Sequence, residues 1–158
     1  MRSLFGALLW SLFLLFALVL YHREEKRRLA EYRGLCRLTE HLRLSLAGAP
    51  MPLSLIYERF SDDALAHAGF LSSLKSEGLL PALASKTLHL DDDELRPFQA
   101  YAEGLGNRLY VEEQRATENL LSDVTEILRQ KEAAFPRKKR LTGTLFFTGG
   151  MMVLLLLL

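Results

Sequence analysis

The chain has 158 residues, of which 49% are hydrophobic and 25% are charged, and this length suits a single domain with a modest core. Its one cysteine, Cys36, excludes an internal disulfide. The net charge is only +1, but residues 38–128 hold fifteen acidic against seven basic side chains, while residues 23–37 and 129–140 each hold six basic ones. This acidic middle argues against nucleic acid as a partner, because binding to phosphates requires clustered cations.

The first hydrophobic run, residues 3–21, contains no charge. Nineteen residues make a helix of roughly 28 Å, so we interpret the run as a transmembrane helix. A cleaved signal peptide is the alternative, but the run lacks a small-residue cleavage site and continues directly into charged sequence. Ser3, Ala7 and Ser11 recur every four residues, a spacing that would let another membrane helix pack closely.

Residues 22–140 are predicted to form an all-α domain, an antiparallel bundle of about six helices between two membrane helices. No segment alternates apolar and polar residues for long enough to indicate a strand. Leucines every three or four residues predict that a long helix leaves the membrane and ends near Gly48, and Pro52 opens a short helix that runs to Phe60.

The next helices of the domain are delimited by their caps. Ser61 is expected to cap a helix that ends at Gly78, and Pro81 is expected to open another that runs through Leu88. Asp91 is the predicted cap of the next helix. The glycines between residues 104 and 107 end that helix.

The last long helix of the domain is predicted from Arg108 to Phe135, and a kink at Pro136 should offset the second hydrophobic run from it. This run, residues 141–158, is uncharged and would make a second transmembrane helix of roughly 27 Å. Lys and Arg concentrate on the cytoplasmic flanks of membrane helices. The domain is therefore expected to be cytoplasmic and both ends of the chain to face outward, as indicated by six flanking basic residues: Arg27, Arg28, Arg137, Lys138, Lys139 and Arg140.

The sequence contains no recognisable catalytic or metal-binding motif. The four histidines lack the spacing of a helical metal site, and residues 104–106 lack the lysine of a phosphate-binding loop. We therefore expect a protein that is not an enzyme and uses no cofactor, metal or small-molecule substrate. A membrane-tethered enzyme or regulator, with an active site assembled only in the fold, is the alternative. The most acidic stretch is the candidate site for docking a protein partner: Asp91, Asp92, Asp93 and Glu94.

The order of several motifs resembles that of the stage III sporulation protein AB family of endospore-forming bacteria. These motifs are Gly34-Leu35-Cys36-Arg37-Leu38-Thr39-Glu40, Pro50-Met51-Pro52-Leu53, Leu105-Gly106 and Glu113-Gln114, set between two hydrophobic runs. The resemblance covers nearly the whole chain. It implies a non-catalytic component of the channel between mother cell and forespore, in the mother-cell membrane. This family is similar to the inner-membrane platform proteins of type II secretion and type IV pilus machines. The implied partners are an ATPase of the stage III sporulation AA type and other channel subunits.

Overall fold

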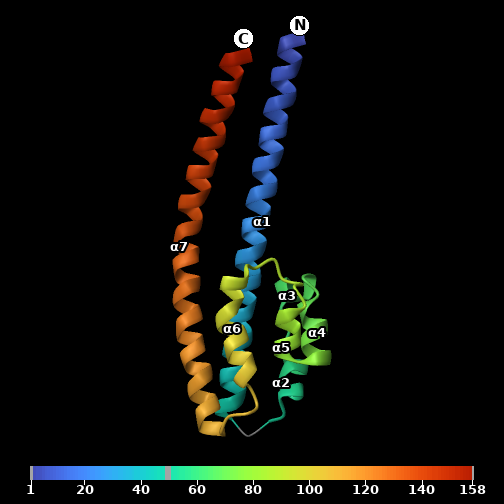
Figure 1. Ribbon diagram of the computed structural model, residues 1–158, viewed down its shortest axis with the longest axis vertical. Helices are drawn as coiled ribbons and strands as arrows, with labels where there is room; N and C mark the ends of the chain where they lie inside the picture. The colour runs from blue at the N-terminus through green and yellow to red at the C-terminus, as the bar shows by residue number, and fades with distance from the viewer. Residues whose placement is uncertain (1, 49–50, 158) are drawn as a thin grey trace. The chain divides into compact units, whose positions relative to one another are not determined.

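The computed structural model describes the backbone of residues 2–48 and 51–157 (Figure 1). In these ranges the description leaves out the side chains at positions 2–5, 7, 8, 11, 150 and 153–157. The described chain contains helices and no strand, which confirms the predicted all-α class. Its helices are α1 (Arg2–Ala47), α2 (Leu53–Arg59), α3 (Asp63–His67), α4 (Phe70–Glu77), α5 (Leu79–Ala84), α6 (Asp92–Gly104) and α7 (Tyr110–Leu157).

The chain forms two compact units. One, the terminal unit, consists of Met1–Lys26 and Gln130–Leu158, and the other, the central unit, consists of Arg27–Arg129. The helices α1 and α7 each contribute to both units. The basic part of α7 belongs to the terminal unit, and the predicted membrane boundaries at residues 22 and 140 stay predictions.

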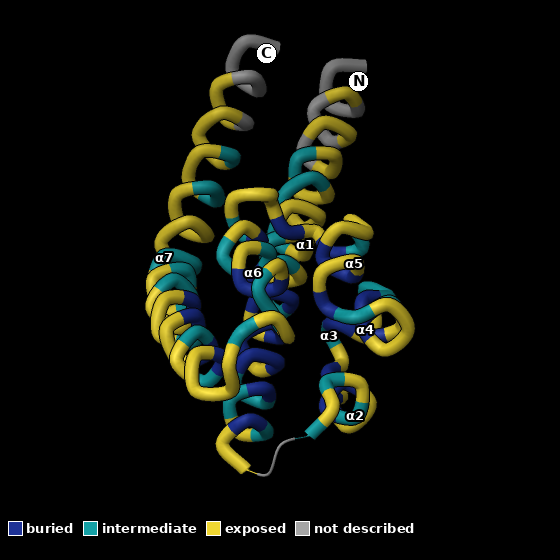
Figure 2. The backbone as a smooth tube through the Cα atoms, turned by 60° about the horizontal axis from the view of Figure 1, so that its bottom comes forward, coloured by how far each residue is buried: buried dark blue, intermediate teal, exposed yellow. Residues whose placement is uncertain are grey.

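In the central unit, α7 lies on one side of α1 and α6, and the short helices α2 to α5 lie on the other (Figures 1 and 2). The predicted leucine stripe of α1 forms the middle of the core, where Leu35, Leu38 and Leu42 are fully buried. Figure 2 shows this buried stripe in dark blue. Each of the helices α2 to α7 adds buried side chains to this core, among them Ile56, Leu65, Phe70, Leu74, Leu83, Phe98, Leu120 and Val124.

Two helix boundaries differ from the predicted ones around α3. Asp62, and not Ser61, is the N-cap of α3, and its carboxylate accepts a hydrogen bond from the backbone N–H of Leu65 at 3.1 Å. The helix expected to run to Gly78 is split into α3 and α4 at Gly69, whose φ of 78° lies in the left-handed region. Glycine adopts this conformation at little cost, so one residue is enough to redirect the chain.

The end of α4 and the break after α6 also lie at glycines with positive φ. Gly78, with a φ of 91°, ends α4 as predicted, but α5 begins directly after it at Leu79, two residues before Pro81. The helix α5 also ends at Ala84, earlier than predicted, and residues 85–91 form an irregular connection in which Lys86 has a positive φ. The predicted break at residues 104–107 is confirmed, and Gly106 there has a φ of 83°.

The predicted end of this helix at Phe135 is wrong, because α7 runs without interruption through Pro136, whereas the predicted kink at Pro136 stays a prediction. A proline inside a helix removes one backbone hydrogen bond, and the remaining bonds of a long helix hold the adjacent turns in place.

No helix of the described residues is long and apolar enough to cross a membrane. The predicted membrane segments, residues 3–21 and 141–158, are helical where their backbone is described, but several of their side chains lie outside the described residues. The structure thus supports the helical class of these segments and does not support their membrane-spanning character.

Candidate functional site

The N-terminus of α6 carries the four acidic residues that were predicted as a docking site. Asp91 is the N-cap, as predicted, and forms a capping box with Glu94, whose carboxylate accepts a hydrogen bond from the backbone N–H of Asp91 at 2.9 Å. Asp92 and Asp93 fill the rest of the first turn. Carboxylates are stable here because they offset the exposed N–H groups and the positive end of the helix dipole.

Arg28 of α1 contacts two carboxylates of this turn. Its guanidinium lies 3.0 Å from the carboxylate of Glu94 and also contacts that of Asp91. Burial by itself would lower the pKa of Arg28, but the hydrogen bonds to Glu94 and Asp91 outweigh it and raise the pKa above its ordinary value. Arg28 therefore engages two of the four acids, Asp91 and Glu94, and this arginine, predicted to flank the membrane, is held against α6.

Asp91, Asp92 and Asp93 are all exposed, but Arg28 engages Asp91 and contacts neither Asp92 nor Asp93. Asp93 pairs with Arg96 one turn later at 2.9 Å, but both of these side chains are largely exposed, so water screens the pair. The surface available to a partner is thus smaller than the sequence suggested. It consists of two adjacent carboxylates at the start of α6.

Glu31 lies next to this turn and was not identified from the sequence. Its side chain is 1% exposed, and it accepts hydrogen bonds from the backbone N–H of His89 at 2.7 Å and from Arg27 at 3.3 Å. Its other contact is with Nδ1 of the His89 ring, at 3.0 Å. One signal in the sequence could have revealed it, since Glu31 is in helical register with the core leucines Leu35, Leu38 and Leu42.

A carboxylate bound to a histidine is a pair that some enzymes use for proton transfer. Here the arrangement instead fixes the connection between α5 and α6 onto α1, because both carboxylate oxygens of Glu31 accept bonds from His89 and the carboxylate is closed to solvent. A substrate could not reach it without displacing the core. Within the described residues, no group of three or more His, Cys, Asp or Glu side chains could hold a metal ion.

Residues 34–40, one of the motifs that carry the family resemblance, pack α3 against α1. A Cβ atom on Gly34 would lie 2.8 Å from the carboxylate of Asp62 and 2.8 Å from Cγ of Leu65, so only glycine lets the start of α3 approach α1 this closely. Arg37 then binds the same carboxylate, with Nε 2.8 Å from Oδ2 of Asp62. One buried aspartate therefore caps α3 and joins it to α1.

The Glu113-Gln114 motif has a comparable role at the start of α7. Glu113 is buried and accepts hydrogen bonds from the backbone N–H of Gly106 and from Arg108, both at 3.3 Å. Gln114 donates to the carbonyl of Leu46 at 2.9 Å, and the hydroxyl of Tyr110 donates to the same carbonyl and to that of Gly48. The first turns of α7 thus satisfy carbonyls at the end of α1, which no helical partner can reach.

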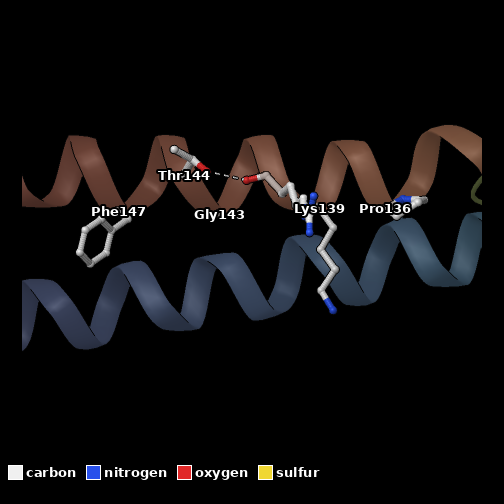
Figure 3. Close-up of a pocket in the computed structure, with 6 residues that line it drawn as sticks. Pro136, Lys139, Gly143, Thr144 and Phe147 are labelled. Carbon is white, nitrogen blue, oxygen red and sulfur yellow. Dashed lines mark hydrogen bonds between the residues drawn. The ribbon is translucent and has the colours of Figure 1, made fainter.

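The remaining predicted residues lie in the terminal unit. The side chains of Ser3, Ala7 and Ser11 fall outside the described residues. The four basic residues of α7 that were predicted to flank a membrane are exposed: Arg137, Lys138, Lys139 and Arg140. Among these, Lys138 lies 3.7 Å from the carboxylate of Glu25 in α1, and Lys139 and Arg140 line a groove on α7 (Figure 3).

Taken together, these features define an all-helical protein whose polar contacts join helices and cap their ends. Comparisons with known proteins add no family to this description. No protein-family model matches the sequence, and no characterised protein or solved structure shows significant similarity to it.

Proposed function

We propose that this protein is a non-catalytic membrane platform, with its terminal unit in the bilayer and its central unit available to a partner. The observation that carries the proposal is the exposed apolar surface of the terminal unit. In α1 it includes Leu9, Trp10, Leu12, Phe13, Leu15, Phe16, Val19 and Leu20, and in α7 it includes Leu141, Leu145, Phe147, Met151 and Met152. Apolar surface of this extent marks a site that contacts lipid or protein.

The distribution of these residues favours lipid. At 100° per residue, the eight exposed side chains between Leu9 and Leu20 cover roughly 220° of the circumference of α1. A helix that packs one face on a protein core needs an apolar stripe of about 100°. A helix whose exposed surface is apolar around most of its circumference is suited to contact with lipid on several sides. The two segments also belong to the same compact unit, as expected for a pair of membrane helices.

The orientation proposed for this platform follows from the charges. The basic flanks favour a central unit at the cytoplasmic surface and both ends of the chain outward. Together with the motif resemblance, this arrangement supports a role in the channel between mother cell and forespore. In that role the central unit docks an ATPase, and the terminal unit associates with other channel subunits.

Membrane insertion can be tested by extracting membranes that contain the full chain with alkaline carbonate. The wild type should stay with the membrane. A double substitution, Leu12→Arg with Met151→Arg, should release it, because charges near the bilayer centre are costly in both helices. Leu80→Arg changes an exposed leucine of the central unit and is the matched control, which should stay with the membrane. Release of the wild type by carbonate would contradict the proposal.

The orientation needs a different measurement. Cys36 is 7% exposed and is unsuited to labelling, so a cysteine is introduced at the exposed Ser54 of α2. An impermeant thiol reagent should not label Ser54→Cys in intact cells. The same reagent should label this cysteine after the cells are opened. Arg2→Cys, on the outward side of the first run, should react in intact cells. The opposite pattern would invert the proposed topology.

The docking surface is tested by reversing the charges of Asp92 and Asp93, the two carboxylates of the acidic turn that Arg28 does not engage. Asp92→Lys with Asp93→Lys should reduce recovery of the ATPase with the full chain from sporulating membranes, since a complementary basic surface would then be repelled. Glu58→Lys with Glu77→Lys makes the same change in charge at exposed positions of α2 and α4 and should leave recovery unchanged. Equal recovery with both double variants would exclude this surface, and no recovery with the wild type would exclude the ATPase as partner.

A further inference from the structure

A groove of about 610 Å³ runs along α7 in the terminal unit (Figure 3). Its lining changes in character along the helix. Lys139 and Arg140 are at one end, Gly143 and Thr144 follow one turn later, and Phe147 lies one further turn along. The cationic and apolar ends are thus separated by roughly 12 Å of helix, at 1.5 Å per residue.

The two cations of the groove are available to a ligand. In the part of the chain that the structure describes, neither Lys139 nor Arg140 forms an ion pair, whereas their neighbour Lys138 lies 3.7 Å from Glu25. Thr144 donates its hydroxyl to the backbone carbonyl of Arg140 at 2.9 Å, so this hydroxyl is used within the helix. The anion-binding capacity of the groove therefore resides in its two cationic side chains.

The other end of the groove is open and apolar. No atom lies within 4 Å of the position that a Cβ on Gly143 would occupy, so a ligand can approach the backbone of α7 there. Phe147 is 72% exposed. Figure 3 shows that Phe147 and Lys139 extend from the same side of α7. A ligand that contacts both ends of the groove needs an anionic group and, roughly 12 Å from it, an apolar chain.

We propose that this groove binds one anionic glycerophospholipid, with its phosphate between Lys139 and Arg140 and an acyl chain along Gly143 and Phe147. The inference rests on the proposed function, since it requires the terminal unit to be in a bilayer. A free phosphate would leave the apolar end unused, and the cationic headgroup of a zwitterionic lipid would be repelled by the two side chains. Phosphatidylglycerol has the required charge and length.

The test uses the full chain in mild detergent, titrated with phosphatidylglycerol or with phosphatidylcholine, and counts bound lipids by native mass spectrometry. The wild type should retain one phosphatidylglycerol and discriminate against phosphatidylcholine. Lys139→Gln with Arg140→Gln should weaken phosphatidylglycerol binding by roughly 30-fold, the effect of two juxtamembrane cations. Gly143→Leu keeps every charge and should also weaken binding, because it fills the groove.

Arg137→Gln with Lys138→Gln is the matched control, because it removes the same charge from residues that do not line the groove. The fold-loss of phosphatidylglycerol affinity in this control should be smaller than that in the groove double variant by a factor of at least about five, which corresponds to one bound cation. Equal losses in the two double variants would overturn the proposal in favour of diffuse attraction. Displacement of the lipid by millimolar inorganic phosphate would also overturn it and would identify a free anion as the ligand.

This experiment separates the inference from the proposed function. A chain that resists carbonate extraction but binds both lipids equally would refute the groove and leave the membrane platform intact. A chain that carbonate releases would refute both.

Discussion

At the scale of single residues, the central unit depends on buried polar groups that serve several partners at once. Glu31 accepts bonds from Arg27 and from both the backbone and the ring of His89, and Asp62 joins Arg37 to the cap of α3. A buried polar group is costly when a partner is lost, because the group left behind has already given up its water. These residues are therefore the most sensitive polar positions of the unit.

Glu31→Gln should lower the free energy of unfolding by about 1–3 kcal/mol. The amide keeps one acceptor oxygen but turns an NH₂ group toward the donors of His89 or Arg27. Glu58→Gln, at an exposed position of α2, should change it by less than about 0.5 kcal/mol. Urea unfolding of the full chain, followed by circular dichroism, compares the two. Equal midpoints would show that the buried carboxylate makes no net contribution.

Alkaline pH should unfold the central unit through its buried tyrosines. Burial raises the pKa of Tyr101 to about 12, although its hydrogen bond with Thr117 acts in the opposite direction, and burial also raises the pKa of Tyr32 and Tyr57. An unfolded tyrosine loses its proton near pH 10. Between about pH 10 and 12 the unfolded state therefore binds fewer protons than the folded one, and stability falls as pH rises.

The measurement follows tyrosinate absorbance and helical circular dichroism during one pH titration. Ionisation of these three tyrosines should coincide with loss of helix. Full ionisation of all five tyrosines near pH 10 in a chain that remains helical would contradict the role assigned to burial.

At the scale of elements, the long helices are secured at the end of the bundle where α1 stops and α7 starts. Four carbonyls at the end of any helix lack an intrahelical partner. Here Tyr110 and Gln114 of α7 donate to the carbonyl of Leu46, and Tyr110 also reaches that of Gly48. The connection between these helices in the chain is 62 residues long, from 48 to 109, so the contact is a product of the fold and not of local sequence.

Removing these donors should fray the last turn of α1. Tyr110→Phe and Gln114→Ala should each speed hydrogen exchange at residues 42–47 by about five-fold, the effect of about 1 kcal/mol per lost hydrogen bond. Arg115→Gln, at the adjacent exposed position, should leave these rates unchanged. If exchange in α1 does not respond to either variant, then water satisfies these carbonyls equally well.

At the scale of the whole molecule, the hydrophobic core is confined to one of the two units. Its buried members extend from Tyr32 to Val124, and the partly buried residues packed against them end at Leu128. All of these lie within Arg27–Arg129. Stabilisation by burial of apolar surface is therefore available to the central unit without the terminal one.

A fragment of residues 27–129 should fold by itself. We expect a helical circular dichroism spectrum and one cooperative thermal transition, as for other single domains of this size. A shorter fragment, residues 49–129, lacks the α1 stripe that forms the middle of the core and should not unfold cooperatively. A non-cooperative transition in the longer fragment would mean that its fold requires the terminal unit.

The local features of the sequence were sufficient for most of the helices. Periodic leucines identified α1 and its buried face, Asp91 identified the start of α6, and Gly78 and Gly106 marked ends, because helix periodicity and capping depend on residues only a few positions apart. The errors arose where two local signals competed. Ser61 and Asp62 are both good caps, and the chain uses the second; Pro136 disfavours a helix, yet α7 continues through it.

The long-range contacts of the candidate site could not be predicted from local sequence. The acidic turn was visible in the sequence, but its engagement by Arg28, 63 residues before Asp91, was not. Nor was the bond between Glu31 and His89, which are 58 residues apart. By itself, the sequence determined the all-α class, the apolar ends and the basic flanks, since each depends on composition and short-range pattern. Only the tertiary structure decided which charges are used internally and which remain exposed, because that depends on which distant helices pack together.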